Sequence, residues 1–165
     1  MRLLIFQLIL FIHIFLGITW VGGVMFVGWG VFPAISSLTF SEQRNVLATV
    51  MKKAHPLFIL AGIGVIVSGL VLGTILGPLH QWGDIWNTLY GKRWAVAFIT
   101  ASLSLIWGAS ISFKSMMAVL ANNTLWQLAD KGITTPLNRS LRFAKFLASF
   151  EVAGFIVVIM VMVLL

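Results

Sequence analysis

Four long apolar blocks constrain the fold of this chain more than any other feature of its sequence. They cover about residues 3–32, 54–76, 92–119 and 141–165, and each is close to or above the roughly 20 residues that a helix needs to cross a bilayer. Only 9% of the residues are charged, against about 25% in an average soluble domain. The sequence therefore predicts a single transmembrane domain over residues 1–165, an all-α integral membrane four-helix bundle in up-down-up-down order.

Breaker and capping residues predict where these helices begin and end. Pro33 is expected to end the first helix, and Gly77-Pro78 the second. Ser41 is predicted as the N-cap of a helix that starts outside the bilayer and leads into the second span. The first block begins with Arg2 like a signal peptide, but its apolar run continues to about Phe32, so we expect a retained helix.

The basic residues predict the orientation. Eight of them fall in or beside the two longer connections, residues 34–53 and 121–140, whereas Arg2, Lys92 and Arg93 fall on the other side. Because cytoplasmic loops carry the excess of Lys and Arg, we expect both termini outside the cytoplasm, in a bacterial inner membrane. The net charge of +7 then reflects contact with anionic lipid and not a nucleic-acid partner. The eight residues are Arg44, Lys52, Lys53, Lys114, Lys131, Arg139, Arg142 and Lys145.

The residues that are missing exclude several kinds of chemistry. The chain has no cysteine, which excludes disulfides, thiolate metal sites, covalently attached c-type haem and cysteine nucleophiles. No nucleophile triad, phosphate-binding glycine loop or glycosidase-like pair of carboxylates is present. Whether the chain is an enzyme stays open; if it is, oxidoreductase chemistry is expected.

His13 is the strongest candidate for a functional residue. An ionisable side chain at membrane depth is costly, so it usually faces a partner, a cofactor or a cavity. His13, Gly17 and Trp20 lie at i, i+4 and i+7 on one helical face, so His13 could be an axial ligand of haem b, with room for the flat ring at Gly17 and a stacking side chain at Trp20. A purely structural histidine, bonded to a hydroxyl such as Thr100 or Ser104, is the alternative.

A stripe of small residues in the second helix carries a second pair of candidates. Gly62 and Gly69 lie on one face together with His55, at spacings of three and four residues. Such stripes usually mark helix–helix contact, and a flat cofactor lying against the glycines is the alternative.

Soft donors suggest copper as an alternative cofactor. Met51 and His55 lie at i and i+4, and thioether and imidazole groups suit Cu(I); Met25 and His13 complete the candidate metal set. His55 could instead be a hydrated histidine at the membrane boundary. A rise of about 1.5 Å per residue puts His13 and His55 at depths that differ by roughly 15 Å, which favours separate sites. His80, in the connection before the third helix, is closer to the level of His13, although a loop histidine is usually solvated.

Glu151 is the one acidic residue within an apolar span. It follows Lys145 by six residues, or roughly 9 Å of helix. A free carboxylate is unfavourable there, so we expect an ion pair with His55, Lys145 or Arg142, or a role as a proton relay.

Three segments within residues 8–115 resemble a known family. They are His13…Trp20-Val-Gly22-Gly23…Phe32-Pro33, then Val67-Ser68-Gly69-Leu70, then Leu89-Tyr90-Gly91-Lys92-Arg93-Trp94. Their order resembles the copper-resistance protein D (CopD) superfamily of small membrane bundles, which includes the HemJ-type protoporphyrinogen oxidases. The resemblance implies a four-helix membrane domain that binds b-type haem or copper, with His13 as a ligand. The lysine that this family often carries inside the third helix is absent, since Lys92 and Arg93 lie only at its start.

The leading hypothesis is a membrane b-haem protein in electron transfer or porphyrin redox chemistry, working with a redox partner or a quinone. Copper or other metal transport, as in CopD, is the alternative. The third hypothesis is a cofactor-free structural or partner-binding bundle. Association into a homo-oligomer stays open under all three hypotheses.

Overall fold

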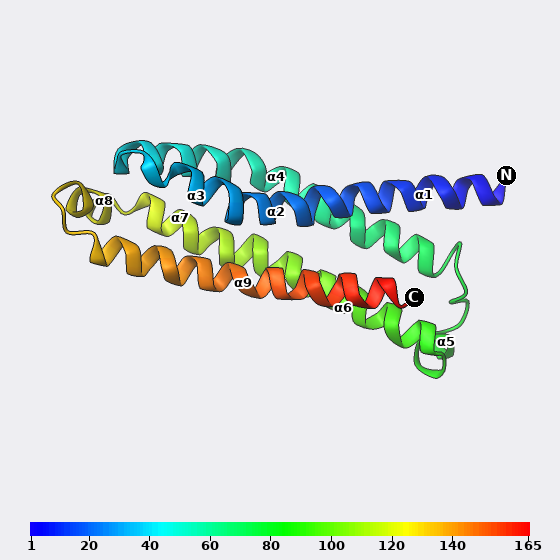
Figure 1. Cartoon of the computed structure of the whole chain (residues 1–165). Helices are drawn as coiled ribbons and strands as arrows, with labels where there is room; N and C mark the ends of the chain where they lie inside the picture. Colours follow the sequence, from blue (N-terminus) through cyan, green and yellow to red (C-terminus); the bar gives the residue numbers. More distant parts are fainter.

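The computed structural model describes residues 1–165 throughout and is built from helices without any strand. Four helical stretches are long and apolar enough to cross a membrane, and they lie side by side as a bundle (Figure 1). The prediction of an all-α four-helix membrane bundle is therefore confirmed. The four spans are Arg2–Ser37, Phe40–Gly73, Leu89–Ala121 and Thr135–Val163.

The first span changes its hydrogen-bonding pattern several times. The expectation that Pro33 ends this helix is wrong, because the helix continues to Ser37. Pro33 directly follows the π turn Val27–Val31, in which the Phe32 N–H bonds to the Val27 carbonyl, and this shift in hydrogen-bond register accommodates the missing proline N–H. In chain order the elements are α1 (Arg2–Gly17), the π turn η1 (Ile18–Gly22), α2 (Gly23–Phe26), the π turn η2 (Val27–Val31), α3 (Phe32–Ala34) and the 3-10 turn η3 (Ile35–Ser37).

The second span is the single helix α4 (Phe40–Gly73). Its N-cap is Thr39 and not Ser41, because Thr39 and Glu42 form a capping box: the Glu42 N–H donates to Thr39 Oγ1 at 3.3 Å, and the Thr39 N–H donates to a Glu42 carboxylate oxygen at 3.0 Å. The helix ends at Gly73, slightly before the expected end at residue 76.

Two short helices occupy the connections, which the sequence pattern did not reveal. They are α5 (Trp82–Asn87) and α8 (Asn123–Asp130). The third and fourth spans also begin earlier than predicted, at Leu89 and Thr135. The third consists of α6 (Leu89–Trp107), the π turn η4 (Gly108–Ser112) and α7 (Phe113–Ala121), and the fourth is α9 (Thr135–Val163).

The spans pack as two pairs. α1 packs against α4, and α6 packs against α9, so that the pairs form two layers (Figure 1). Both termini lie at the end that carries α5, called here the α5 end, and α8 closes the opposite α8 end (Figure 1). Between the layers, the first span and α9 face each other with little direct backbone packing.

The largest buried cluster lies at the α8 end. Trp126 of α8 is 2% exposed and its indole N–H donates to the Val119 carbonyl at 3.0 Å. Arg44 of α4 ties the same region together by donating to the Leu120 carbonyl at 2.7 Å and to Asn123 Oδ1 at 2.6 Å. This end of the bundle therefore holds the largest buried core of the protein.

Candidate functional site

His13 lies in α1 and faces α4. Its Nδ1 atom is 2.8 Å from Ser68 Oγ, and a Cβ placed on Gly69 would lie 3.2 Å from its Cε1 atom. The sequence suggested Thr100 or Ser104 as the hydroxyl partner. The structure shows Ser68 instead, because α1 packs against α4 and not against α6.

The hydrogen bonds of Ser68 assign the proton on the His13 ring. The Ser68 hydroxyl donates to the Gly64 carbonyl at 2.6 Å. A hydroxyl has one hydrogen, so Ser68 Oγ must accept from His13, and Nδ1 of the neutral ring carries the proton. Nε2 then keeps its lone pair, which the ring can offer to a metal or to a hydrogen-bond donor.

The glycine stripe of α4 is filled by protein side chains. A Cβ on Gly62 would lie 2.7 Å from a methyl group of Leu105 and 3.1 Å from the Trp20 ring, and the His13 ring covers Gly69. In this structure the stripe is a helix-packing surface, with side chains in the place that a flat cofactor would take. Gly17 is different, because a Cβ there would meet nothing within 4 Å.

A cavity of about 410 Å³ lies between the four spans, on the α8 side of Trp20. Of its 26 lining residues 19 are hydrophobic, which is typical of a site for an apolar small molecule. Its polar residues include His55 on α4, Ser112 in η4, and Lys145, Ser149 and Glu151 on α9.

All three π turns border this cavity. η1 contributes Trp20, η2 contributes Gly28 and Trp29, and η4 contributes Gly108 and Ser112. Single π turns within α-helices are frequent at functional sites, because the extra residue turns side chains and carbonyls away from the regular helical direction. Their concentration around one cavity singles it out as a second candidate site.

The cavity collects most of the predicted metal donors but not His13. Met25, Met51 and His55 all line it, and the His55 ring stacks on Phe113 with 3.5 Å between centroids and 6° between planes. His13 packs at the level of Ser68, thirteen residues or roughly 20 Å along α4 from His55. The two histidines therefore lie at separate places, as the depth estimate predicted.

Glu151 lies at the end of the cavity that is nearest to Trp20, away from the α8 end. It is 7% exposed, and a Cβ on Gly108 would overlap its carboxyl group, so the carboxyl packs directly on the η4 backbone. The polar group that faces its carboxyl is the Trp20 indole N–H. Glu151 therefore interacts with an indole, and not with the basic partners expected from the sequence.

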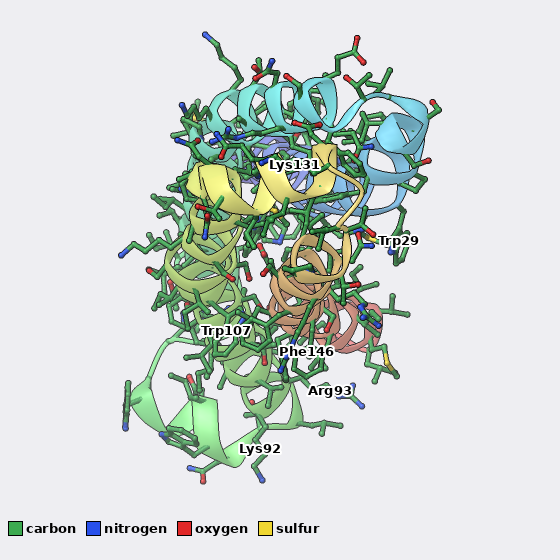
Figure 2. The ribbon with its side chains drawn as sticks, turned by 90° about the vertical axis from the view of Figure 1, so that its left-hand side faces the viewer. Trp29, Lys92, Arg93, Trp107, Lys131 and Phe146 are labelled. Carbon is green, nitrogen blue, oxygen red and sulfur yellow. The ribbon has the colours of Figure 1, made fainter.

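Two side-chain pairs join the first span to α9, one at each end of the cavity. At the end away from α8, the Trp20 and Phe155 rings meet edge to face with centroids 4.9 Å apart. At the α8 end Lys145 Nζ lies 4.3 Å from the centroid of the Phe32 ring, which is a cation–π contact. Figure 2, a view from the α8 end, shows Trp29 on the side where the first span and α9 face each other; Trp29 is 68% exposed.

His80 lies apart from both sites, in the exposed connection before α5. Its backbone N–H donates to Asp84 Oδ2 at 2.9 Å, as does the Gln81 N–H at 2.8 Å. These two bonds hold the pKa of Asp84 below its ordinary value. No cluster of three or more His, Cys, Asp or Glu side chains occurs in the chain, at His80 or elsewhere.

Two residues that matter here were not predicted from the sequence in these roles. Ser68 was noted only as part of a motif, and no sequence signal pairs a serine of one helix with a histidine of another. Lys145 was predicted as a topology signal and as a partner of Glu151, yet it lies at the mouth of the cavity.

No family model, curated protein or solved structure matches the chain. The resemblance to the CopD superfamily accordingly stays a prediction, and function is inferred from the geometry of the sites.

Proposed function

We propose that the chain is a membrane b-haem protein with His13 as an axial ligand. The observation that carries the proposal is the Ser68–His13 hydrogen bond. Histidine ligands of metals nearly always donate their second ring N–H to an oxygen acceptor, which fixes the ring and its tautomer. His13 has this arrangement at membrane depth, with Nε2 as the free donor atom.

Around His13 the open position is on α1 and not on α4. Gly17, one turn further along, leaves open space, whereas the α4 glycines are covered by side chains. Haem bound there would supply one-electron redox chemistry within the bilayer. Its partners in electron transfer or porphyrin redox chemistry would then be lipid-soluble, with quinones as the leading class, or a second copy of the chain.

The test is a visible spectrum of the protein purified in mild detergent, before and after dithionite. We expect a Soret band and sharp reduced α and β bands that are lost in His13→Ala and retained in His80→Ala, the matched control in an exposed loop. A colourless wild-type protein from haem-replete cells, or a haem spectrum unchanged by His13→Ala, would reject His13 ligation and favour a cofactor-free bundle.

Copper binding is the second candidate, and one observation favours it. Met25, Met51 and His55 come from two different spans and line the same cavity, which also includes Met116. Thioether and imidazole donors suit Cu(I). Metal analysis after loading with Cu(I) under reducing conditions tests it: stoichiometric copper lost in Met51→Leu supports the proposal, and copper retained in that variant opposes it.

We infer that the α8 end faces the cytoplasm and that both termini lie outside it. Both termini lie at the α5 end, whereas the eight basic residues in or beside the two longer connections belong to the α8 half (Figure 1). Because the chain has no cysteine, single cysteines at Lys131 and Gln81 can report sidedness. In bacterial cells with an intact inner membrane, an impermeant maleimide should label Gln81→Cys and spare Lys131→Cys; the reverse result would invert the topology.

A further inference from the structure

We propose that the cavity beside Trp20 binds one acyl chain of an acidic phospholipid, with the lipid head group held at Lys145. The proposal does not depend on haem at His13. It depends on the shape of the cavity, its side opening and the charge at its mouth.

The cavity has the length of one bilayer leaflet. It lies between the Trp20–Phe155 pair and the Phe32–Lys145 pair. These pairs are twelve residues apart on the first span and ten residues apart on α9, which corresponds to roughly 18 and 15 Å of helix. Half of a hydrocarbon core of about 30 Å is about 15 Å. An acyl chain that lies along the cavity therefore reaches from the membrane boundary to the bilayer centre.

The exposed lining residues place the opening of the cavity at its side, between the first span and α9. Gly28 and Trp29 of η2 lie on one side of this opening, and Ser149 of α9 lies on the other. All three residues are exposed. The first span and α9 pack little between the Trp20–Phe155 pair and the Phe32–Lys145 pair. A lipid can therefore place one acyl chain in the cavity while its other chain stays in the bilayer. A two-chain lipid suits such an opening better than a compact solute does.

The charge at the mouth selects an acidic head group. Lys145 lines the α8 end of the cavity, and the contact found for its ammonium group is the face of Phe32, which is not an anion. Arg142 lies three residues earlier on the same face of α9. Glu151, the acidic group of the cavity, is roughly 9 Å deeper and is covered by Trp20 and Gly108. A phosphate at the membrane boundary therefore meets the cations and not the carboxyl group.

The experiment titrates the purified detergent-solubilised protein with single lipids and counts bound molecules by native mass spectrometry. We expect one phosphatidylglycerol to bind more tightly than phosphatidylcholine of the same chains. Lys145→Gln should weaken phosphatidylglycerol about fivefold, since one Lys near an anionic lipid is worth about 1 kcal/mol. Lys145→Arg should restore the binding, and Lys114→Gln, a lysine outside the cavity, should leave it unchanged.

A second pair of variants tests the cavity itself. A Cβ at Gly28 or at Gly22 meets nothing within 4 Å, but only Gly28 lines the cavity. Gly28→Leu, whose Cβ has open space, should therefore fill part of the cavity and remove the bound lipid, and Gly22→Leu should retain it. Equal binding of the two phospholipids, unchanged binding in Gly28→Leu, or oleic acid binding as tightly as phosphatidylglycerol would each overturn the proposal. The haem spectrum of Gly28→Leu should match that of the wild type, so this result is separate from the His13 hypothesis.

Discussion

His13 donates a hydrogen bond from Nδ1 to Ser68 Oγ at 2.8 Å, and Ser68 donates its own proton to the Gly64 carbonyl. This chain of two bonds joins the first span to α4 and fixes both the orientation and the tautomer of an imidazole inside the bilayer. It explains why a histidine is tolerated at that depth and leaves Nε2 for a ligand.

Ser68→Ala should therefore weaken haem binding without removing the ligand. Loss of an oxygen partner behind a metal-bound histidine typically costs about 10–100-fold in affinity, and we expect a loss in that range. Titration of haem into the apoprotein, followed at the Soret band, measures it. Ser102→Ala is the matched control, because Ser102 also bonds a carbonyl of its own helix but contacts no histidine. A Ser68→Ala affinity equal to that of the control would show that the hydrogen bond does not support ligation.

Gly73→Ala should destabilise the bundle, whereas Gly17→Ala should not. A Cβ on Gly73 would overlap the Trp94 indole nitrogen, and that indole is held by its bond to the Gly69 carbonyl and by stacking on Phe98. Overpacking of this kind costs about 1–3 kcal/mol. At Gly17 the space is open, and alanine in a helix is favoured over glycine by about 0.5–1 kcal/mol. Unfolding in mixed micelles with increasing SDS compares the two; equal stabilities would contradict the close packing of Trp94 on α4.

The sequence predicted the architecture because the bilayer leaves few choices. Every backbone polar group must be satisfied within the span, so an apolar block of about 20 residues becomes a helix. Helix ends were predicted less well. Thr39 and Ser41 are both capping residues, and only the reciprocal bond with Glu42 distinguishes them. Pro33 was predicted to break the first helix because proline usually does so, and the π turn in front of it did not appear in the hydrophobic pattern.

The sequence predicted only those parts of the sites that lie on a single helix. Periodicity placed His13 beside Gly17 and Met51 beside His55, since these pairs lie on single helices. Which residues meet across helices depends on the angles and rotations of the spans, and periodicity does not give these. The cavity, the Ser68 partner and the meeting of Glu151 with Trp20 all arise between helices, and for that reason the sequence did not show them.

Acid should loosen the connection around α5. The Asp84 carboxylate accepts the His80 and Gln81 N–H groups, so its folded pKa lies below its unfolded value. A carboxyl group with a lowered pKa contributes stability above the unfolded pKa, and that contribution is lost as the pH falls through the folded pKa. Hydrogen exchange of residues 79–88 should therefore speed up below about pH 4 beyond the intrinsic pH effect. In Asp84→Asn the exchange should already be fast at about pH 7 and should show no such added change; a carboxylate-independent acid effect would appear in both proteins.

Glu151 should prove to be half of a matched pair with Trp20. Glu151→Gln keeps an oxygen acceptor for the Trp20 indole N–H and should change stability little. Glu151→Leu leaves that buried N–H without an acceptor, which costs about 1–3 kcal/mol. Trp20→Phe removes the donor while keeping a ring against Phe155. The double variant Trp20→Phe/Glu151→Leu should therefore lose less stability than the sum of the losses in the two single variants. SDS unfolding of the four proteins of this cycle gives the coupling directly, with about 0.5–3 kcal/mol expected for residues in contact. Strict additivity would mean that the carboxyl group is held by Gly108 packing alone and that the indole bond contributes nothing.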